Sequence, residues 1–141
     1  MSPLQALQQA LAGEHAAVYV YGVLGARASA SEQPELSSRL VSAYTTHRGR
    51  RDRLTAVIRR AGAEPVAAEV AYRLPSPART AAQLDAAALA VERRCAEVYA
   101  QATGSTSRSH RRWAVHALLD AAVRQLAFGG RPEDFPGVPE L

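Results

Sequence analysis

Residues 13–22 read GEHAAVYVYG, and they place a carboxylate on the apolar face of a helix. Apolar residues around this stretch recur at steps of three and four, the spacing of one helical face. That face contains Leu4, Leu7, Leu11, Glu14, Val18, Tyr21 and Gly25. Glu14 lies where a leucine is expected. A buried carboxylate is costly unless a cation or hydrogen-bond donors meet it, so Glu14 predicts a polar centre inside the fold.

Helix start and stop signals divide the chain into four helices. Ser2 and Gln5 form a capping-box pattern at the first helix, and Thr80 and Gln83 repeat it at the third. Gly62 is a typical helix terminator. The predicted helices cover residues 3–30, 34–61, 80–103 and 107–128. No segment shows the two-residue alternation of a half-buried strand, so the predicted class is all-α.

The links between the helices predict their arrangement. Short links join the first helix to the second and the third to the fourth, which indicates two antiparallel hairpins. Residues 63–79, AEPVAAEVAYRLPSPAR, can reach about 55 Å when extended, whereas the second helix is about 40 Å long. This crossover can therefore span the bundle, although a loop in a simple up-and-down bundle meets the same lengths. We expect one four-helix domain over residues 1–141, with a tail at 129–141.

The composition limits the cellular compartments in which we expect the protein. All 17 basic residues among the 141 are arginine, and the formal net charge is +4. Cys95 is the single cysteine, so an internal disulfide is impossible. No apolar run reaches the roughly 18 residues of a membrane helix, and no signal peptide pattern opens the chain. We expect a cytoplasmic protein that does not bind membranes.

The two predicted hairpins share a motif. Residues 14–21, EHAAVYVY, and 92–99, ERRCAEVY, both carry a Glu followed seven residues later by a Tyr. Seven residues are two helical turns, so each Glu and its Tyr share one face. The second helix of each hairpin carries a His, at positions 47 and 116. The predicted inward face of the last helix contains Trp113, His116, Asp120, Val123 and Ala127.

These motifs resemble an uncharacterised, domain-of-unknown-function branch of the ferritin-like superfamily, over nearly the whole chain. The resemblance is carried by GEHAAVYVYG (13–22), HRGRRDRL (47–54), YRLPSP (72–77), WAVHALLDAAVRQL (113–126) and FPGVPE (135–140). It implies a ferritin-like four-helix bundle of two hairpins joined by a long crossover, and homodimerisation. It names no substrate.

The resemblance also implies a metal centre, which this chain matches only in part. Ferritin-like carboxylate proteins hold two metal ions with one Glu from each of two helices and a Glu-x-x-His pair from each of the others. Glu14 and Glu92 match the lone glutamates, and His47 and His116 match the histidines. Tyr44 and Trp113 stand where the remaining two glutamates belong. Two carboxylates balance the charge of only one divalent ion, which argues against a two-metal centre.

Two interpretations of the polar centre remain. In the preferred one no metal binds, because Arg51 or Arg48 reaches Glu14, Glu92 or Asp120. The predicted polar core network then consists of Tyr44, Arg48, Arg51, Trp113 and Asp120 around the Glu and His residues. In the alternative, one divalent ion of iron, manganese or zinc is bound for a redox or oxygen-handling reaction. Its ligands are Glu14, His47, Glu92 and His116, and Tyr44 is a nearby proton or electron donor. The first interpretation favours a protein that is not an enzyme.

A third interpretation rests on the arginine clusters. HRGRRDR (47–53) and RSHRR (108–112) could form an interaction module for an acidic partner or nucleic acid. Acidic residues interrupt the clusters and no nucleic-acid-binding motif accompanies them, so nucleic acid is disfavoured. Tyr21, Tyr99 and Cys95 are interpreted as packing residues, and His15 is expected to face solvent.

Overall fold

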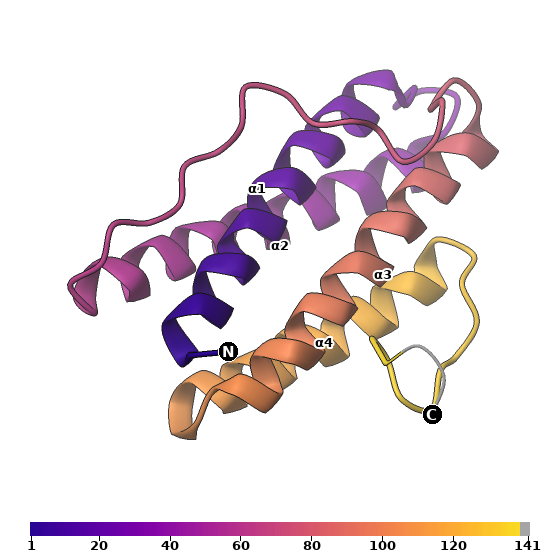
Figure 1. The fold of residues 1–141 in the computed structure, drawn as a ribbon. Helices are drawn as coiled ribbons and strands as arrows, with labels where there is room; N and C mark the ends of the chain where they lie inside the picture. Colours follow the sequence, from indigo (N-terminus) through magenta and orange to yellow (C-terminus); the bar gives the residue numbers. More distant parts are fainter. Residues whose placement is uncertain (139–141) are drawn as a thin grey trace.

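The computed structural model describes residues 1–138 and contains four helices with no strand in that range (Figure 1). The helices are α1 (Pro3–Arg27), α2 (Pro34–Arg60), α3 (Ala81–Ser105) and α4 (Arg108–Ala127). The all-α prediction with four helices is confirmed. Within residues 1–138, no helix combines the length and the apolarity that spanning a membrane requires.

Capping explains where the helices begin. The Ser2 hydroxyl accepts from the Gln5 amide at 3.2 Å, and the Gln5 side chain accepts from the Ser2 amide at 2.8 Å. Thr80 and Gln83 make the same reciprocal bonds at the start of α3. Each box satisfies backbone donors that a helix start otherwise leaves unpaired. Gly62, with φ of +79°, follows α2 in the left-handed conformation that glycine tolerates best.

Two helix ends differ from the predicted boundaries by more than one residue. The first helix ends at Arg27 instead of residue 30, because Ala28 is extended. The third helix continues through Gly104 to Ser105. Thr106 then becomes extended, and its hydroxyl donates to the Ala102 carbonyl at 2.6 Å. A glycine inside a helical pattern is therefore not sufficient to end it here.

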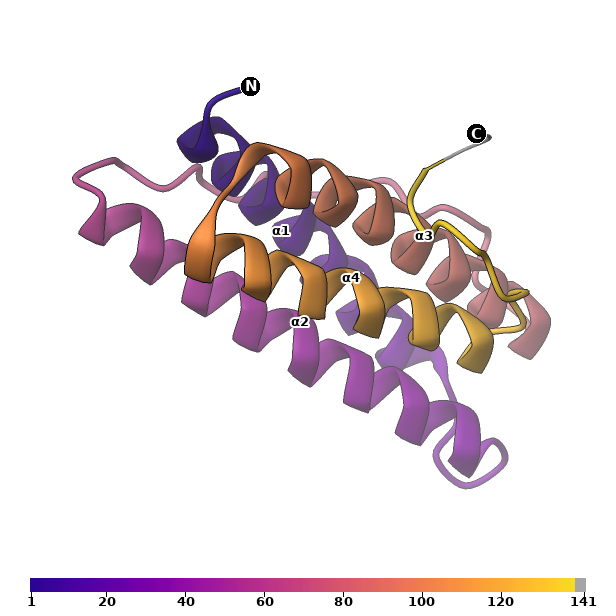
Figure 2. The ribbon, with the colours of Figure 1, turned by 90° about the horizontal axis from the view of Figure 1, so that it is seen from below.

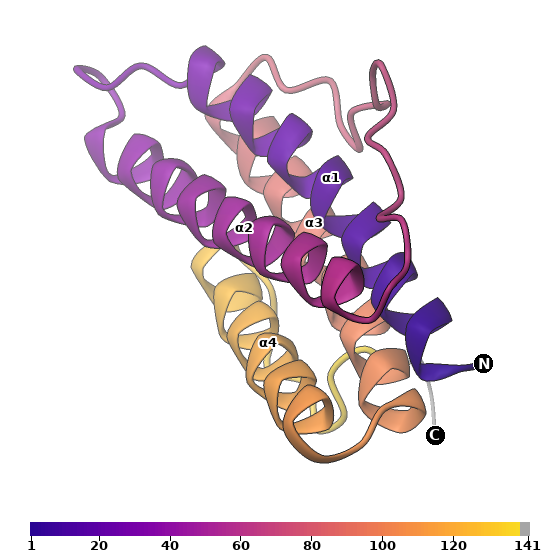
Figure 3. The same ribbon diagram turned by 90° about the vertical axis from the view of Figure 1, so that its left-hand side faces the viewer.

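The helices pack in pairs around a core rich in alanine. Helix α1 packs against α2 and α3, and α3 packs against α4, whereas α2 and α4 approach each other less closely. Figures 2 and 3 show α2 and α4 side by side on one face of the molecule. Fully buried side chains include Leu11, Leu24, Leu40, Leu54 and Ile58. Small residues let the backbones approach, and the large aliphatic residues fill the space between them.

The crossover, residues 61–80, runs along the outside of α1 from the end of α2 to the start of α3 (Figure 1). The Gln8 side chain donates to the Glu64 carbonyl at 2.6 Å and accepts from the Val66 amide at 2.8 Å. His15 Nε2 lies 3.0 Å from the Val66 carbonyl. His15 therefore points away from the core, as expected, but it is only half-exposed because its ring binds the crossover to α1.

The inward face of α4 is not the predicted one. Its buried residues are Ala114, Ala117, Ala121 and Gln125, whereas His116 is exposed and Val123 is 66% exposed. The buried positions lie about one residue further along the helix than the predicted face. Alanines let α4 lie close to α3, and this close packing outweighs the burial of larger side chains. Of the tail, Phe135 is exposed, and residues 139–141 lie outside the described range.

The capping box of α3 predicts a measurable loss of stability. Thr80→Ala should lower the free energy of unfolding by about 1 kcal/mol in urea titrations, because the Gln83 amide loses its acceptor. Thr45 is a matched control, since its hydroxyl only bonds the Val41 carbonyl inside α2. Thr45→Ala should leave stability unchanged or slightly raised. An equal loss in both variants would contradict a capping role.

Candidate functional site

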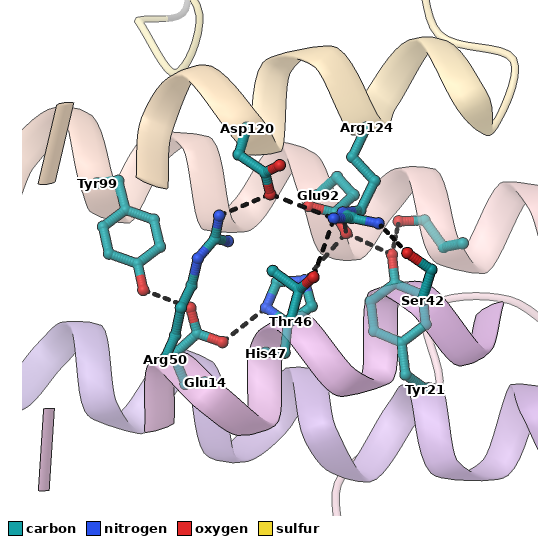
Figure 4. Close-up of polar contacts among 11 residues, drawn as sticks. Glu14, Tyr21, Ser42, Thr46, His47, Arg50, Glu92, Tyr99, Asp120 and Arg124 are labelled. Carbon is teal, nitrogen blue, oxygen red and sulfur yellow. Dashed lines mark hydrogen bonds and ion pairs between the residues drawn. The ribbon is translucent and has the colours of Figure 1, made fainter. Parts of the chain in front are cut away.

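The side chain that meets Glu14 is His47, from the middle of α2. His47 Nδ1 lies 2.6 Å from Glu14 Oε2, and Nε2 lies 3.0 Å from Glu92 Oε1 (Figure 4). All three residues are at most 1% exposed. Both ring nitrogens face carboxylate oxygens, which accept but do not donate hydrogen bonds when ionised. His47 therefore carries both protons and bridges α1 and α3 as an imidazolium.

Each glutamate also receives a hydrogen bond from the tyrosine of the other hairpin. Tyr21 on α1 donates to Glu92 Oε1 on α3 at 2.6 Å. Tyr99 on α3 donates to Glu14 Oε1 on α1. The repeated Glu and Tyr spacing thus produces a reciprocal exchange between α1 and α3, which run antiparallel. The result is a continuous buried chain of side chains, Tyr99, Glu14, His47, Glu92 and Tyr21.

Two arginines and an aspartate extend this chain towards α4. Arg50 Nη2 donates to Asp120 Oδ2 at 2.6 Å, and Arg124 Nη2 donates to the same oxygen at 3.3 Å. Arg124 Nε lies 3.7 Å from Glu92 Oε1. Arg124 Nη2 also donates to Thr46 at 3.1 Å. We call these eight side chains the central network: Glu14, Tyr21, His47, Arg50, Glu92, Tyr99, Asp120 and Arg124.

Guanidinium groups line the whole contact between α2 and α4. The α2 residues that face α4 recur at steps of three and four: Arg39, Ser42, Thr46, Arg50 and Arg53. All three of these arginines also lie over aromatic rings, at about the same distance. Arg39 lies 5.4 Å from the Phe128 ring centre, Arg50 5.5 Å from that of Tyr99, and Arg53 5.4 Å from that of Trp113. This contact is polar and cation–π in character along its length.

The central network is balanced in charge. Its three carboxylates, Glu14, Glu92 and Asp120, face three cations, His47, Arg50 and Arg124. Burial alone would lower the pKa of His47, but the two glutamates outweigh it and raise that pKa from 6.5 to about 9. Burial and Glu92 raise the pKa of Tyr21, and burial and Glu14 raise that of Tyr99. Both phenols therefore stay protonated as donors.

The structure brings together only some of the predicted site residues. Glu14, His47, Glu92 and Asp120 lie in the central network. His116 does not, because it is exposed on α4, one position before the buried Ala117. The placement of His116 among metal ligands is wrong for this geometric reason. A site built from all four predicted ligands therefore cannot form in this arrangement.

The predicted arginine partners are also wrong. Arg48 is exposed on α2, and Arg51 donates to its neighbour Asp52 at 2.9 and 2.8 Å. Arg50 takes the expected role, since it lies three residues after His47 and close to the same face. Arg124, four residues after Asp120, is the second arginine of the network.

The two aromatic residues that replace the missing glutamates lie beside the network. Trp113 packs edge-on against Tyr99, with ring centres 5.6 Å apart. Tyr44 is half-buried near Tyr21, Leu40 and Gly22, and no hydrogen bond joins it to the central network within residues 1–138. Both positions therefore contribute packing around the centre.

Sequence reasoning missed four members of the network. Tyr21 and Tyr99 were predicted to be packing residues, although the repeated Glu and Tyr spacing is a visible signal of their shared role. Arg50 and Arg124 carry a weaker signal, because each lies one turn from an inward polar residue. Only the three-dimensional structure separates them from the other arginines of their clusters.

Cys95 lies closer to the centre than a packing role requires. One donor atom each from Glu14, His47 and Cys95 lie within 4.8 Å of one another, and all three residues are buried. Burial and the two glutamates raise the pKa of the Cys95 thiol. The thiol is therefore protonated at neutral pH, which makes it a poor nucleophile and a poor metal ligand in this state.

Comparison with known proteins places the chain in a family. Residues 6–140 match the family described as domain of unknown function (DUF4439). The chain belongs to this family. The crystal structure of a conserved hypothetical protein, rv2844, from Mycobacterium tuberculosis is similar, with a TM-score of 0.82 and 27% identity. That similarity covers 90% of this chain and 87% of the other. No curated protein matches the sequence.

The raised pKa of His47 predicts that the free energy of unfolding of this protein depends on pH. The imidazolium stabilises the fold fully below pH 6.5, and this contribution should disappear as the pH rises through about 9. The free energy of unfolding of the wild type should therefore fall across this range. His116→Gln, on the surface, should show the same fall, whereas His47→Gln should be less stable at pH 6.5 and lose the dependence. A wild type whose stability is flat across this range would argue against the charged form of His47.

The network predicts a contrast between two arginine variants. Arg124→Ala should lower the free energy of unfolding by about 3 kcal/mol, because Glu92 and Asp120 lose a cation. Arg51→Ala should change it by less than about 0.5 kcal/mol, because its ion pair is on the surface. Urea titrations of both variants measure the difference. Equal effects would mean that Arg124 is not part of a coupled network.

Proposed function

We propose that this chain is a ferritin-like four-helix bundle in which the central network replaces the metal ions, and that it works as a binding protein rather than as an enzyme. Three features support the ferritin-like assignment. Helices α1 and α2 pack together, as do α3 and α4, and a long crossover connects the pairs. Glu14 and Glu92 come from the first helix of each pair.

The charge balance of the central network is the observation that carries this proposal. A two-metal centre does not fit these residues, because it needs about four carboxylates and the buried cluster around His47 supplies Glu14 and Glu92. Both nitrogens of His47 are engaged with those carboxylates, so neither has a lone pair for a metal. Arg50 and Arg124 supply further positive charge where metal ions would otherwise supply it.

In this role the network aligns the helices. His47 joins α2 to α1 and α3, while Arg50 and Arg124 join α2 to α4 and α3. Each of these ion pairs forms only within a narrow range of distances and angles. A helix that slides or rotates would therefore break the pair. Buried ion pairs add little net stability, but they can select one arrangement of a small-residue core. We propose alignment of this kind as the purpose of the network.

The second candidate is a site for one divalent ion. It is favoured by the donor atoms of Glu14, His47 and Cys95, which lie within 4.8 Å of one another. Within residues 1–138, Glu92 Oε2 has no hydrogen-bond partner and offers a fourth ligand. Carboxylate, imidazole and thiolate together suit zinc or iron better than manganese. Such an ion would act as a Lewis acid or redox centre, but His47 and Cys95 must each lose a proton to bind it.

The arginine-rich interaction module has less support. Arg50 and Arg124 are mostly buried and paired with Asp120, and Arg51 is paired with Asp52. These three guanidinium groups do not present free charge to phosphates. A homodimer stays our prediction from the family resemblance, and a cytoplasmic location stays our prediction from the sequence composition.

Elemental analysis separates the first two candidates. Protein expressed with added iron, manganese and zinc, and purified without chelator or metal-affinity resin, should contain no stoichiometric metal. A full equivalent of one metal that disappears in both Glu14→Ala and Cys95→Ser would overturn the metal-free proposal. Glu97→Ala, a surface carboxylate change on the same helix as Cys95, is the control for nonspecific metal.

A further inference from the structure

An apolar groove lies between α1 and α3, on the side that the crossover covers. Its volume is about 700 Å³. Small side chains of both helices form its floor, among them Gly13, Ala16 and Ala17 of α1 and Ala90 of α3. Tyr72 and Pro75 of the crossover border it. The groove exists because small residues leave space that larger ones would fill, and its volume is typical of small-molecule sites.

The crossover border of this groove is fixed in place. The Tyr72 ring packs against Tyr19 of α1, with ring centres 5.5 Å apart, and its hydroxyl accepts from the Glu69 amide at 2.9 Å. Arg27 at the end of α1 donates to the Pro77 carbonyl at 3.2 Å. The groove is therefore bordered by a segment that is attached to α1 on both sides of Tyr72, because Gln8 holds Val66 as well.

The charges at the groove have one sign. Arg73 of the crossover and Arg94 of α3 line it, together with the amides of Gln9 and Gln101, and no carboxylate is among the lining residues. Arg94 donates to Glu97 at 2.9 Å on the surface. Within residues 1–138, Arg73 has no ion-pair partner. A guanidinium without a counterion beside an apolar floor suits an anion that carries an apolar body.

The floor of the groove stops short of the central network. Cys95 lines both the groove and a much smaller cavity of about 10 Å³ that also touches Glu14 and Tyr99. That smaller space holds at most about one water molecule. An occupant of the groove therefore meets a protonated, weakly polar thiol at its inner end and cannot reach Glu14. Its apolar end should lie on the floor, and its charged end should lie at the arginines.

We propose that this groove binds an amphipathic organic carboxylate, with its apolar chain on the floor formed by α1 and α3 and its carboxylate paired with Arg73 and Arg94. The proposal does not depend on whether the central network holds a metal. Binding of this kind would make the bundle a carrier or sensor of such carboxylates. The probe is decanoate, and decanol is its uncharged match.

Isothermal titration calorimetry of the full chain tests the proposal. Decanoate should bind with one-to-one stoichiometry, at concentrations where decanol binds at least about tenfold more weakly, because decanol lacks the charge that a guanidinium pairs with. Absence of decanoate binding would overturn the proposal. Equal binding of decanol would overturn it too, since the arginines would then play no part.

The shape of the site is tested by filling it. A Cβ on Gly13 would lie 4.0 Å from Val98 Cγ2, an ordinary contact, so Gly13→Leu should fold and extend its side chain into the groove. Gly49→Leu is the matched control, because a Cβ there meets nothing within 4 Å and the residue is exposed on α2. Gly13→Leu should abolish decanoate binding and Gly49→Leu should preserve it. Circular dichroism melts confirm folding, and full binding by folded Gly13→Leu would overturn the site.

The charge at the site is tested separately. Arg73→Gln should weaken decanoate binding about tenfold and leave decanol unchanged, because only the carboxylate uses the guanidinium. Arg48→Gln removes the same charge from an exposed position on α2 and should have no effect on either probe. Equal weakening by both variants would indicate attraction to net charge alone and would overturn the proposed pairing.

Discussion

The contact between His47 and the two glutamates is the interaction on which the rest of the structure depends. Its imidazolium lies between Glu14 of α1 and Glu92 of α3, at 2.6 and 3.0 Å, with no exposed surface. Without it, two carboxylates would face each other in an apolar core, and their desolvation would oppose the packing of α1 against α3. The two tyrosine hydrogen bonds hold the carboxylates in the orientation that His47 needs. One charged ring from α2 thus allows both helix pairs to meet.

The contact between α2 and α4 shows how the fold accommodates the remaining charge. Large apolar side chains are absent from the α2 positions that face α4, and arginines with Ser42 and Thr46 take their place. A long guanidinium side chain spans a wider separation than a leucine does, which agrees with the looser approach of these two helices. Aromatic rings lie beneath the three guanidinium groups and stabilise them by cation–π contact. The contact between α2 and α4 is therefore closed mainly by polar side chains, whereas the other helix contacts combine apolar packing with the buried hydrogen bonds and ion pairs of the central network.

The sequence predicted the helices and the polar centre well, and it predicted the partners of that centre poorly. Capping boxes and glycines are local signals, so the helix starts could be derived from a few residues. Glu14, His47 and Glu92 interrupt apolar faces, which marks them as buried. Helix α4 carries alanine and larger apolar residues on several faces, so periodicity could not separate Ala117 from His116. Arg50, Arg51 and Arg48 are neighbours, and only the rotation of α2 in the bundle decides which of them points inward.

The central network and the groove both depend on the small residues that α1 and α3 carry where they meet. Gly13 precedes Glu14 in the sequence, Ala17 follows it three residues later, and both line the groove. Because these side chains are small, the two helices can exchange hydrogen bonds between Glu14 and Tyr99 and between Glu92 and Tyr21. The same smallness leaves the outer side of the contact unfilled, below the crossover. A larger residue at Gly13 would extend into the groove and fill it, because a Cβ there makes only an ordinary contact with Val98. The buried ion cluster and the open apolar site therefore depend on one packing arrangement, and the groove shares Gly13, Arg94, Cys95 and Val98 with the small cavity beside Glu14.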